Sequence, residues 1–165
     1  MNHDNLIEAL QEIRFLHDIG PMHLETISKI ARLRDFNEGD IVFRQGDAAE
    51  HVYLVVYGSV SLEICAAGAG CQQILTLGPG ELLGWSSVLE QLCYTARARS
   101  LDSTRVVEIN IAQLLSICER DPQFGYELMR RTALALAKRL SATRMQLLNV
   151  YGPNLPQIPQ QVEAR

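Results

Sequence analysis

Residues 78–101 read GPGELLGWSSVLEQLCYTARARSL, and this stretch is the most informative about the fold. The Gly-Pro-Gly of residues 78–80 predicts a tight turn, and a short apolar run follows it. Gly84 then precedes a short helical segment, and residues 95–101 alternate between small and charged side chains, as a strand does. A glycine at a helix start suits an anion, because the first backbone N–H groups of a helix have no internal partner and bear partial positive charge.

Along the rest of the chain, the spacing of apolar residues changes from helical to strand-like and then back to helical. Apolar spacing predicts helices over residues 4–17, with Asp4 as the cap, and over 22–31, separated by a break at Gly20-Pro21. Strands are predicted at 33–36, 41–43, 51–57, 60–65, 71–77, 97–101 and 106–109. Helical period returns at 111–118, with Asn110 as the cap, and at 121–150. This order predicts a mainly β protein with flanking helices, in which an antiparallel β-roll or jelly-roll barrel (a double-stranded β-helix) lies between N-terminal helices and a long C-terminal helix.

Composition limits the possible classes of protein. The chain has 165 residues, of which 47% are hydrophobic and 21% charged, enough for one domain with a core. Its net charge of −4 argues against a broad basic surface for nucleic acid. No apolar run approaches the roughly 20 residues that span a bilayer, and no basic start precedes an apolar block. We expect a cytoplasmic protein without membrane association.

The four cysteines do not form a metal-binding pattern. They lack a CxxC pair and have no histidine at zinc-ligand spacing, so no metal site is predicted. Cys65 and Cys71 flank the sequence AAGAG, a predicted hairpin tip, and so face each other across it. A reversible disulfide and free thiols both remain open at this point, and a reducing cytoplasm favours the thiols. The scattered histidines are interpreted as surface or capping residues.

Three features of the sequence belong together: the order of the elements, two turn motifs and a set of spaced glycines. The motifs are FNEGDIVFRQGD at 36–47 and HVYLVVYGSVSL at 51–62, and the glycines are at 39, 46, 58, 80 and 84. Together they resemble the cyclic nucleotide-binding domain of the catabolite activator and fumarate-nitrate regulator superfamily, over residues 6–150. The resemblance implies a domain over 1–152, with helices in 4–31, the roll in 33–109 and helices in 111–151. The tail 153–165 is Pro- and Gln-rich and is expected to be disordered.

The resemblance implies that residues 83–96 form the phosphate-binding cassette. The family pattern is Gly-Glu-Leu-Ala-Leu, then about six residues, then Pro-Arg-Ser/Thr-Ala, in which the Glu binds the ribose and the Arg the cyclic phosphate. Here Gly84 matches the glycine, but the Glu falls on Trp85 and the Arg on Tyr94. The candidate ligand pocket therefore comprises Leu83, Gly84, Trp85, Ser86, Ser87, Tyr94, Thr95 and Ala96.

These two replacements weaken the expected site. A hydrogen bond to a charged group contributes about 1.5–3 kcal/mol, so losing both costs roughly 3–6 kcal/mol, on the order of 10²–10⁴ in affinity. We therefore disfavour cAMP or cGMP as a ligand and predict no other cofactor. Trp85 either packs in the core, filling the ribose position, or stacks on a flat ligand. Arg97 and Arg99 point away from the interior, unless a bulge near Thr95 turns Arg97 back.

The long C-terminal helix contains an apolar stripe. In the resembling transcription factors this helix is the dimer seam, so a homodimer is predicted, with simple packing against the roll as the alternative. The stripe consists of Met129, Ala133, Leu136, Leu140 and Leu147. Only the Pro-rich tail follows, which cannot supply a helix-turn-helix, so we expect no sequence-specific DNA binding.

The sequence leaves three classes of function to consider. The first is a sensor or regulatory module of the cyclic nucleotide-binding type with an unidentified small ligand or none. An alternative form of this first function is a cAMP-binding domain with an atypical pocket. The second is a protein-protein interaction scaffold. The third, an enzyme, is disfavoured because the sequence has no Ser/His/Asp or Cys/His set at supportive spacing and no Walker loop.

Overall fold

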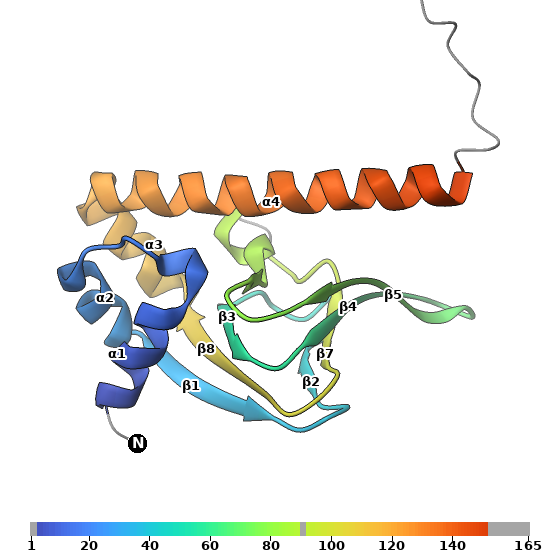
Figure 1. Ribbon diagram of the computed structural model, residues 1–165, viewed down its shortest axis with the longest axis horizontal. Helices are drawn as coiled ribbons and strands as arrows, with labels where there is room; N and C mark the ends of the chain where they lie inside the picture. The colour runs from blue at the N-terminus through green and yellow to red at the C-terminus, as the bar shows by residue number, and fades with distance from the viewer. Residues whose placement is uncertain (1–2, 90–91, 152–165) are drawn as a thin grey trace, which may run out of the picture. The chain divides into compact units, whose positions relative to one another are not determined.

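The computed structural model describes residues 3–89 and 92–151. Helices flank a set of strands, as the sequence predicts (Figure 1). The N-terminal helical elements are α1 (His3–Glu12), the 3₁₀ turn η1 (Arg14–Leu16) and α2 (Pro21–Ser28). The strands are β1 (Ala31–Phe36), β2 (Ile41–Phe43), β3 (His51–Tyr57), β4 (Val60–Ala66), β5 (Gly70–Leu77), β6 (Leu82–Leu83), β7 (Arg97–Ser100) and β8 (Thr104–Asn110). The turn η2 (Trp85–Leu89) lies between β6 and β7, and α3 (Ile111–Arg120) and α4 (Pro122–Tyr151) follow β8.

The strands form two antiparallel four-stranded sheets, ordered β1-β8-β3-β6 and β2-β7-β4-β5. Their inner faces enclose an apolar cluster that includes Phe43, Tyr53 and Tyr94. The opposite face of the first sheet packs against α1, α2 and α3 through a second cluster, where Leu54 and Val107 meet Leu10 and Ile27. The predicted β-roll between flanking helices is confirmed.

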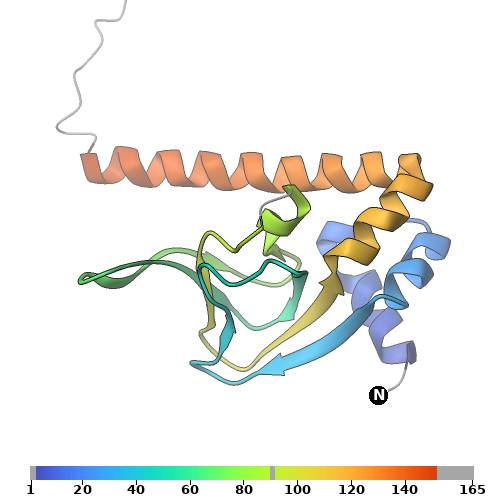
Figure 2. The same cartoon turned by 180° about the vertical axis from the view of Figure 1, so that it is seen from behind.

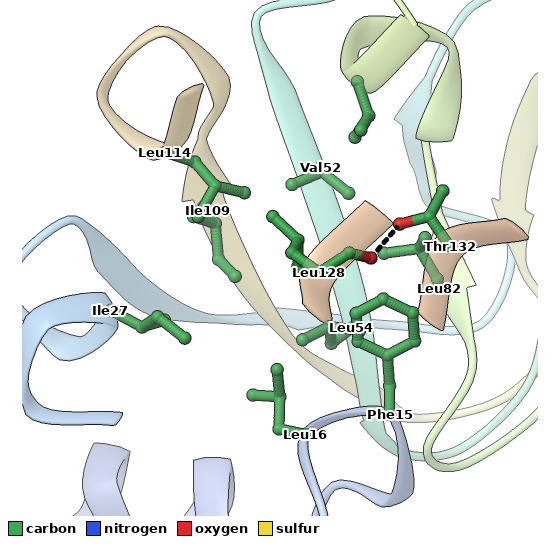
Figure 3. Close-up of a pocket in the computed structure, with 11 residues that line it drawn as sticks. Phe15, Leu16, Ile27, Val52, Leu54, Leu82, Ile109, Leu114, Leu128 and Thr132 are labelled. Atoms are coloured by element: carbon green, nitrogen blue, oxygen red, sulfur yellow. Dashed lines mark hydrogen bonds between the residues drawn. The ribbon is translucent and has the colours of Figure 1, made fainter. Parts of the chain in front are cut away.

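The pocket drawn in Figure 3 lies within this helix-side cluster. Its side chains come from η1, α2, β3, β6, η2, β8, α3 and the start of α4. Thr132 Oγ1 donates a hydrogen bond to the Leu128 carbonyl, 2.9 Å away. The free volume is about 10 Å³, which is at the lower limit for one water molecule. It is therefore a packed core and not a ligand site.

Three local expectations were wrong. The helix predicted over 4–17 ends at Glu12, and η1 then keeps Leu16 buried, which explains why the apolar spacing continues past the helix end. The helix predicted over 22–31 ends at Ser28, because Ala31 already pairs with Ile109 in β1–β8. Strand β6 was not predicted, since its two residues are too few to show a period.

Cys65 and Cys71 form a disulfide, which corrects the expectation of free thiols. The two cysteines are register partners in β4 and β5, with Cα atoms 3.9 Å apart. Their hairpin projects away from the other strands in both ribbon views (Figures 1 and 2). Cys93 and Cys118 are free.

The chain divides into two compact units, Met1–Thr132 and Ala133–Arg165, so α4 begins in the first and continues in the second. The first unit contains the roll and the N-terminal helices. The predicted domain limit at 152 and the tail 153–165 lie beyond the described residues and stay predictions. Over residues 3–89 and 92–151, no helix combines the length and apolarity needed to cross a membrane.

Candidate functional site

Gly84 forms the corner between β6 and η2, as the cassette resemblance implies. Its φ of +70° lies in the left-handed region, where side chains are disfavoured. A Cβ at this position would lie 3.0 Å from the His51 carbonyl oxygen and 3.2 Å from Cε1 of Tyr94. A glycine is therefore required by close packing, and the side of Gly84 from which a side chain would project is covered by Tyr94 and Tyr53.

Tyr94, at the position to which the resemblance assigns the family's phosphate-binding arginine, is buried in the roll and only 4% exposed. Its hydroxyl donates to the His51 carbonyl at 2.7 Å and accepts from the His51 amide at 3.2 Å. Its ring stacks on Phe43, with centroids 4.0 Å apart. Burial raises the pKa of Tyr94, so the side chain stays neutral near pH 7. Tyr94 thus supplies a structural contact and no positive charge.

The backbone of Tyr94 ties the cassette to the loop between β2 and β3. Its carbonyl accepts from the Gly46 amide at 2.9 Å, and its amide donates to the Asp47 carbonyl at 3.0 Å. Ala48 and Cys93 extend this pairing as an isolated bridge. The cassette strand is therefore held on both sides of the aromatic contact.

The other candidate pocket residues are divided between the two clusters. Leu83 is fully buried in the roll interior, whereas Trp85 is half-buried and packs against the helix-side cluster. The core interpretation of Trp85 agrees with this packing, and the expectation that its indole fills the ribose position stays a prediction. Buried Ser86 and exposed Thr95 approach each other, with their hydroxyl oxygens 3.4 Å apart.

The two remaining residues of the predicted pocket are Ala96 and Ser87. Ala96 is half-buried ahead of β7. The Ser87 side chain lies outside the described part of the structure. Among the described residues of this set, Leu83, Gly84 and Tyr94 meet in the roll, and Trp85 packs against the helix-side cluster.

Arg97 and Arg99 do not replace the missing arginine. Strand β7 pairs with β4 in regular register from Arg97 to Ser100, so Ala98 and Ser100 are buried and the arginines lie on the other face, as predicted. The register shift in this sheet is on the β2 side and does not turn Arg97 inward.

Both arginines instead bind Glu63 of β4, which the sequence analysis did not identify. Arg97 Nε donates to Glu63 at 2.7 Å and Arg99 Nε at 2.8 Å, and the Ser61 hydroxyl donates at 2.9 Å. The Glu63 side chain is only 2% exposed. Burial alone would raise the pKa of Glu63, but these hydrogen bonds hold it below its usual value. The two arginines therefore lie on the predicted face of β7, where they are half-buried and paired with Glu63.

Sequence reasoning also missed His51 and Phe43, which hold Tyr94. They lie 43 and 51 positions from Tyr94, and no local pattern links residues so far apart. On α4, Met129 packs partly against the helix-side cluster of its own unit. Of the predicted stripe in the second unit, Leu140 and Leu147 are exposed.

The family model described as "Cyclic nucleotide-binding domain" matches residues 33–121, more than half of the chain. The "Cyclic AMP receptor protein" of Thermus thermophilus is 28% identical over 131 residues, which cover 79% of this chain and 59% of that protein. The "CRP-like cAMP-activated global transcriptional regulator" of Mycobacterium tuberculosis is 25% identical over 150 residues, covering 90% of this chain and 65% of that one. The chain thus spans about three fifths of these curated relatives.

Among solved structures, a Geobacter metallireducens protein named for cyclic nucleotide binding superposes with a TM-score of 0.72 and 29% identity. The match covers 81% of this chain and 96% of that one. It extends from the roll into the flanking helices, as expected for a common architecture. The chain belongs to the cyclic nucleotide-binding domain family, in its CRP-like branch.

Proposed function

We propose that this chain is a non-enzymatic regulatory or sensor module whose roll does not hold cAMP or cGMP in the way usual for the family. The observation that supports this most strongly is the position of Tyr94. The residue aligned with the phosphate-binding arginine is buried, neutral and engaged through its hydroxyl with the His51 backbone. A ligand phosphate at Gly84 would meet aromatic rings in place of a guanidinium.

The two nearest cations in the sequence support the same proposal. Arg97 and Arg99 share the buried carboxylate of Glu63, so moving either one to a phosphate would leave that carboxylate with a single guanidinium. Losing a partner of a buried charge is costly. Neither Arg97 nor Arg99 is therefore available to take over the role that the arginine has in the family.

Isothermal titration calorimetry with cAMP and cGMP tests the proposal. We expect dissociation constants of about 1 mM or weaker, and no rise of the melting temperature with 0.1 mM nucleotide, since a ligand stabilises only by RT ln(1 + [L]/Kd). Micromolar binding that disappears in Gly84→Ala would overturn the proposal in favour of the variant function, a cAMP-binding domain with an atypical pocket.

We further propose that the module is a homodimer through α4. Five apolar side chains of α4 are each between 49% and 59% exposed: Leu134, Leu140, Met145, Leu147 and Leu148. Apolar side chains at such density on a helix are typical of a partner surface. Light scattering checks this: we expect twice the mass of 18.4 kDa, and a monomer after Leu140→Glu and Leu147→Glu. Cytoplasmic location and lack of DNA binding stay predictions.

A further inference from the structure

An open pocket of about 230 Å³ lies beside the roll, apart from the cassette residues. Three segments form it: the junction of α2 with β1, the start of β3, and the junction of β8 with α3. Its polar lining consists of Lys29, Arg32, His51, Glu108, Asn110 and Gln113.

The one carboxylate in the lining is already neutralised. The Glu108 side chain is 3% exposed, binds the Arg32 guanidinium, and accepts from Arg34 Nη1 at 3.1 Å. Two cations thus share one anion, and the Arg32 side chain is still 61% exposed. The neighbourhood of Glu108 therefore has an excess of positive charge, although the whole chain has a net charge of −4.

The amide side chains of the lining also offer donors. Asn110 Oδ1 accepts from the Gln113 amide at 3.0 Å, which fixes the Asn110 side chain with its NH₂ group directed elsewhere. Gln113 is exposed, and its side chain makes no hydrogen bond that the described part of the structure shows. Lys29 pairs with Glu25 at 3.2 Å on the surface, a contact of the kind that contributes little.

We propose that this pocket binds a small organic anion with two negative charges, the chemistry that phosphate monoesters and dicarboxylates share. The fixed acceptors of the lining are occupied, whereas guanidinium, ammonium and amide donors remain available. Arginine and lysine are the usual partners of both kinds of oxyanion. The free volume of about 230 Å³ leaves room for a small organic molecule.

His51 connects this pocket to the cassette. His51 lines the pocket, while its backbone amide donates to the Tyr94 hydroxyl and its backbone carbonyl accepts the proton of that hydroxyl. An anion that reorients His51 therefore acts on the contact that holds Tyr94 in the roll. This inference does not depend on whether the roll binds a cyclic nucleotide.

Calorimetry and amide NMR with three probes test the proposal: inorganic phosphate, glycerol 3-phosphate and malonate, at pH 7 and 0.15 M NaCl. We expect saturable binding of at least one organic probe, with amide shifts at 29–32, 51 and 108–113. Preference for glycerol 3-phosphate over malonate identifies a phosphate ester, and the reverse a dicarboxylate. The variant is Lys29→Ala with Gln113→Ala, because Arg32 also neutralises buried Glu108. Its matched control is Lys138→Ala, which removes the same charge outside the pocket.

The double variant is expected to bind at least about tenfold more weakly, and the control within about twofold of the parent. Either of two results would overturn the proposal: absence of saturation by 10 mM for every probe, or equal loss in the double variant and the control. Shifts confined to residues 83–96 would overturn it as well, since the anion would then sit at the cassette.

Discussion

The Tyr94 hydroxyl is the contact on which the cassette geometry depends, and Tyr94→Phe removes it with little change of shape. The substitution deletes one hydrogen bond to the His51 carbonyl and one from the His51 amide, at 2.7 and 3.2 Å. Removing one partner of a buried hydrogen bond typically costs about 1–3 kcal/mol. We expect Tyr94→Phe to lower the free energy of unfolding by about 2 kcal/mol.

For a chain of this length, 1 kcal/mol shifts the melting temperature by about 2–4 °C, so the expected decrease is about 4–8 °C. Urea unfolding followed by circular dichroism measures the free energy directly. Tyr126→Phe is the matched control, because the Tyr126 side chain is 70% exposed and its loss of a hydroxyl should change stability by less than about 0.5 kcal/mol.

Alkaline pH gives an independent measure of the same burial. The folded-state pKa of Tyr94 is raised by burial above the ordinary value of 10.0. An unfolded chain therefore releases this proton first, and stability that is fully present below pH 10 falls as the pH rises above it. We expect a shallower fall in Tyr94→Phe than in the parent. The buried position of Tyr94 would be refuted by two results together: a stability loss under about 0.5 kcal/mol in Tyr94→Phe, and an equal fall of stability above pH 10 in the variant and the parent.

Three other perturbations test the framework around the site. Glu63→Gln should lower stability by about 1–3 kcal/mol near pH 7, because two arginines lose their shared anion. The folded-state pKa of Glu63 is lowered from its ordinary value of 4.5. The extra stability of the parent over Glu63→Gln should therefore be present above pH 4.5 and be lost as the pH falls from there through the folded-state pKa. If the parent and Glu63→Gln lost stability equally as the pH falls, the pairing of Glu63 with the two arginines would be contradicted. Gly58→Ala should cost about 2–4 kcal/mol, since its Cβ would meet Ser103 O at 2.6 Å at a φ of +85°. Gly39→Ala, which has nothing within 4 Å, should cost only about 1 kcal/mol in the same urea assay. Dithiothreitol should lower stability by about 2 kcal/mol by opening the Cys65–Cys71 loop of separation 6. Thiol titration of the unfolded, unreduced protein should find two free cysteines, and four would show that the bridge is absent.

The fold was predictable because its signals are local. Strands at 41–43 and 51–57 have the predicted bounds, since each is a β-branched or aromatic run ended by a glycine turn. The helix ends were less predictable. Leu16 keeps helical spacing although Glu12 ends α1, because a 3₁₀ turn buries it against the same cluster.

The site was only partly predictable, since its decisive contacts join distant residues. The sequence indicates that Tyr94 lacks the charge of an arginine, but it does not show that His51 occupies its hydroxyl. Strand alternation placed Arg97 and Arg99 on the face away from the interior. Ser61 and Glu63 in β4 alternate in the same way, so a buried glutamate opposite Arg97 becomes apparent only once β4 and β7 are in register.

Each sheet contains one buried glutamate held by two arginines: Glu63 in the second and Glu108 in the first. In the second sheet this pairing uses both cations that follow the cassette, while the cassette itself has become part of the aromatic core through Tyr94. Placing an arginine at position 94 would therefore not recreate the family's phosphate grip. The guanidinium would have to enter a space that Phe43, Tyr53 and the Gly84 corner already fill, and His51 would lose its partner. Under the proposed function, the tyrosine at position 94 and the packing of the roll interior around it would thus have to change together, and that packing needs Gly84 whether or not a phosphate binds.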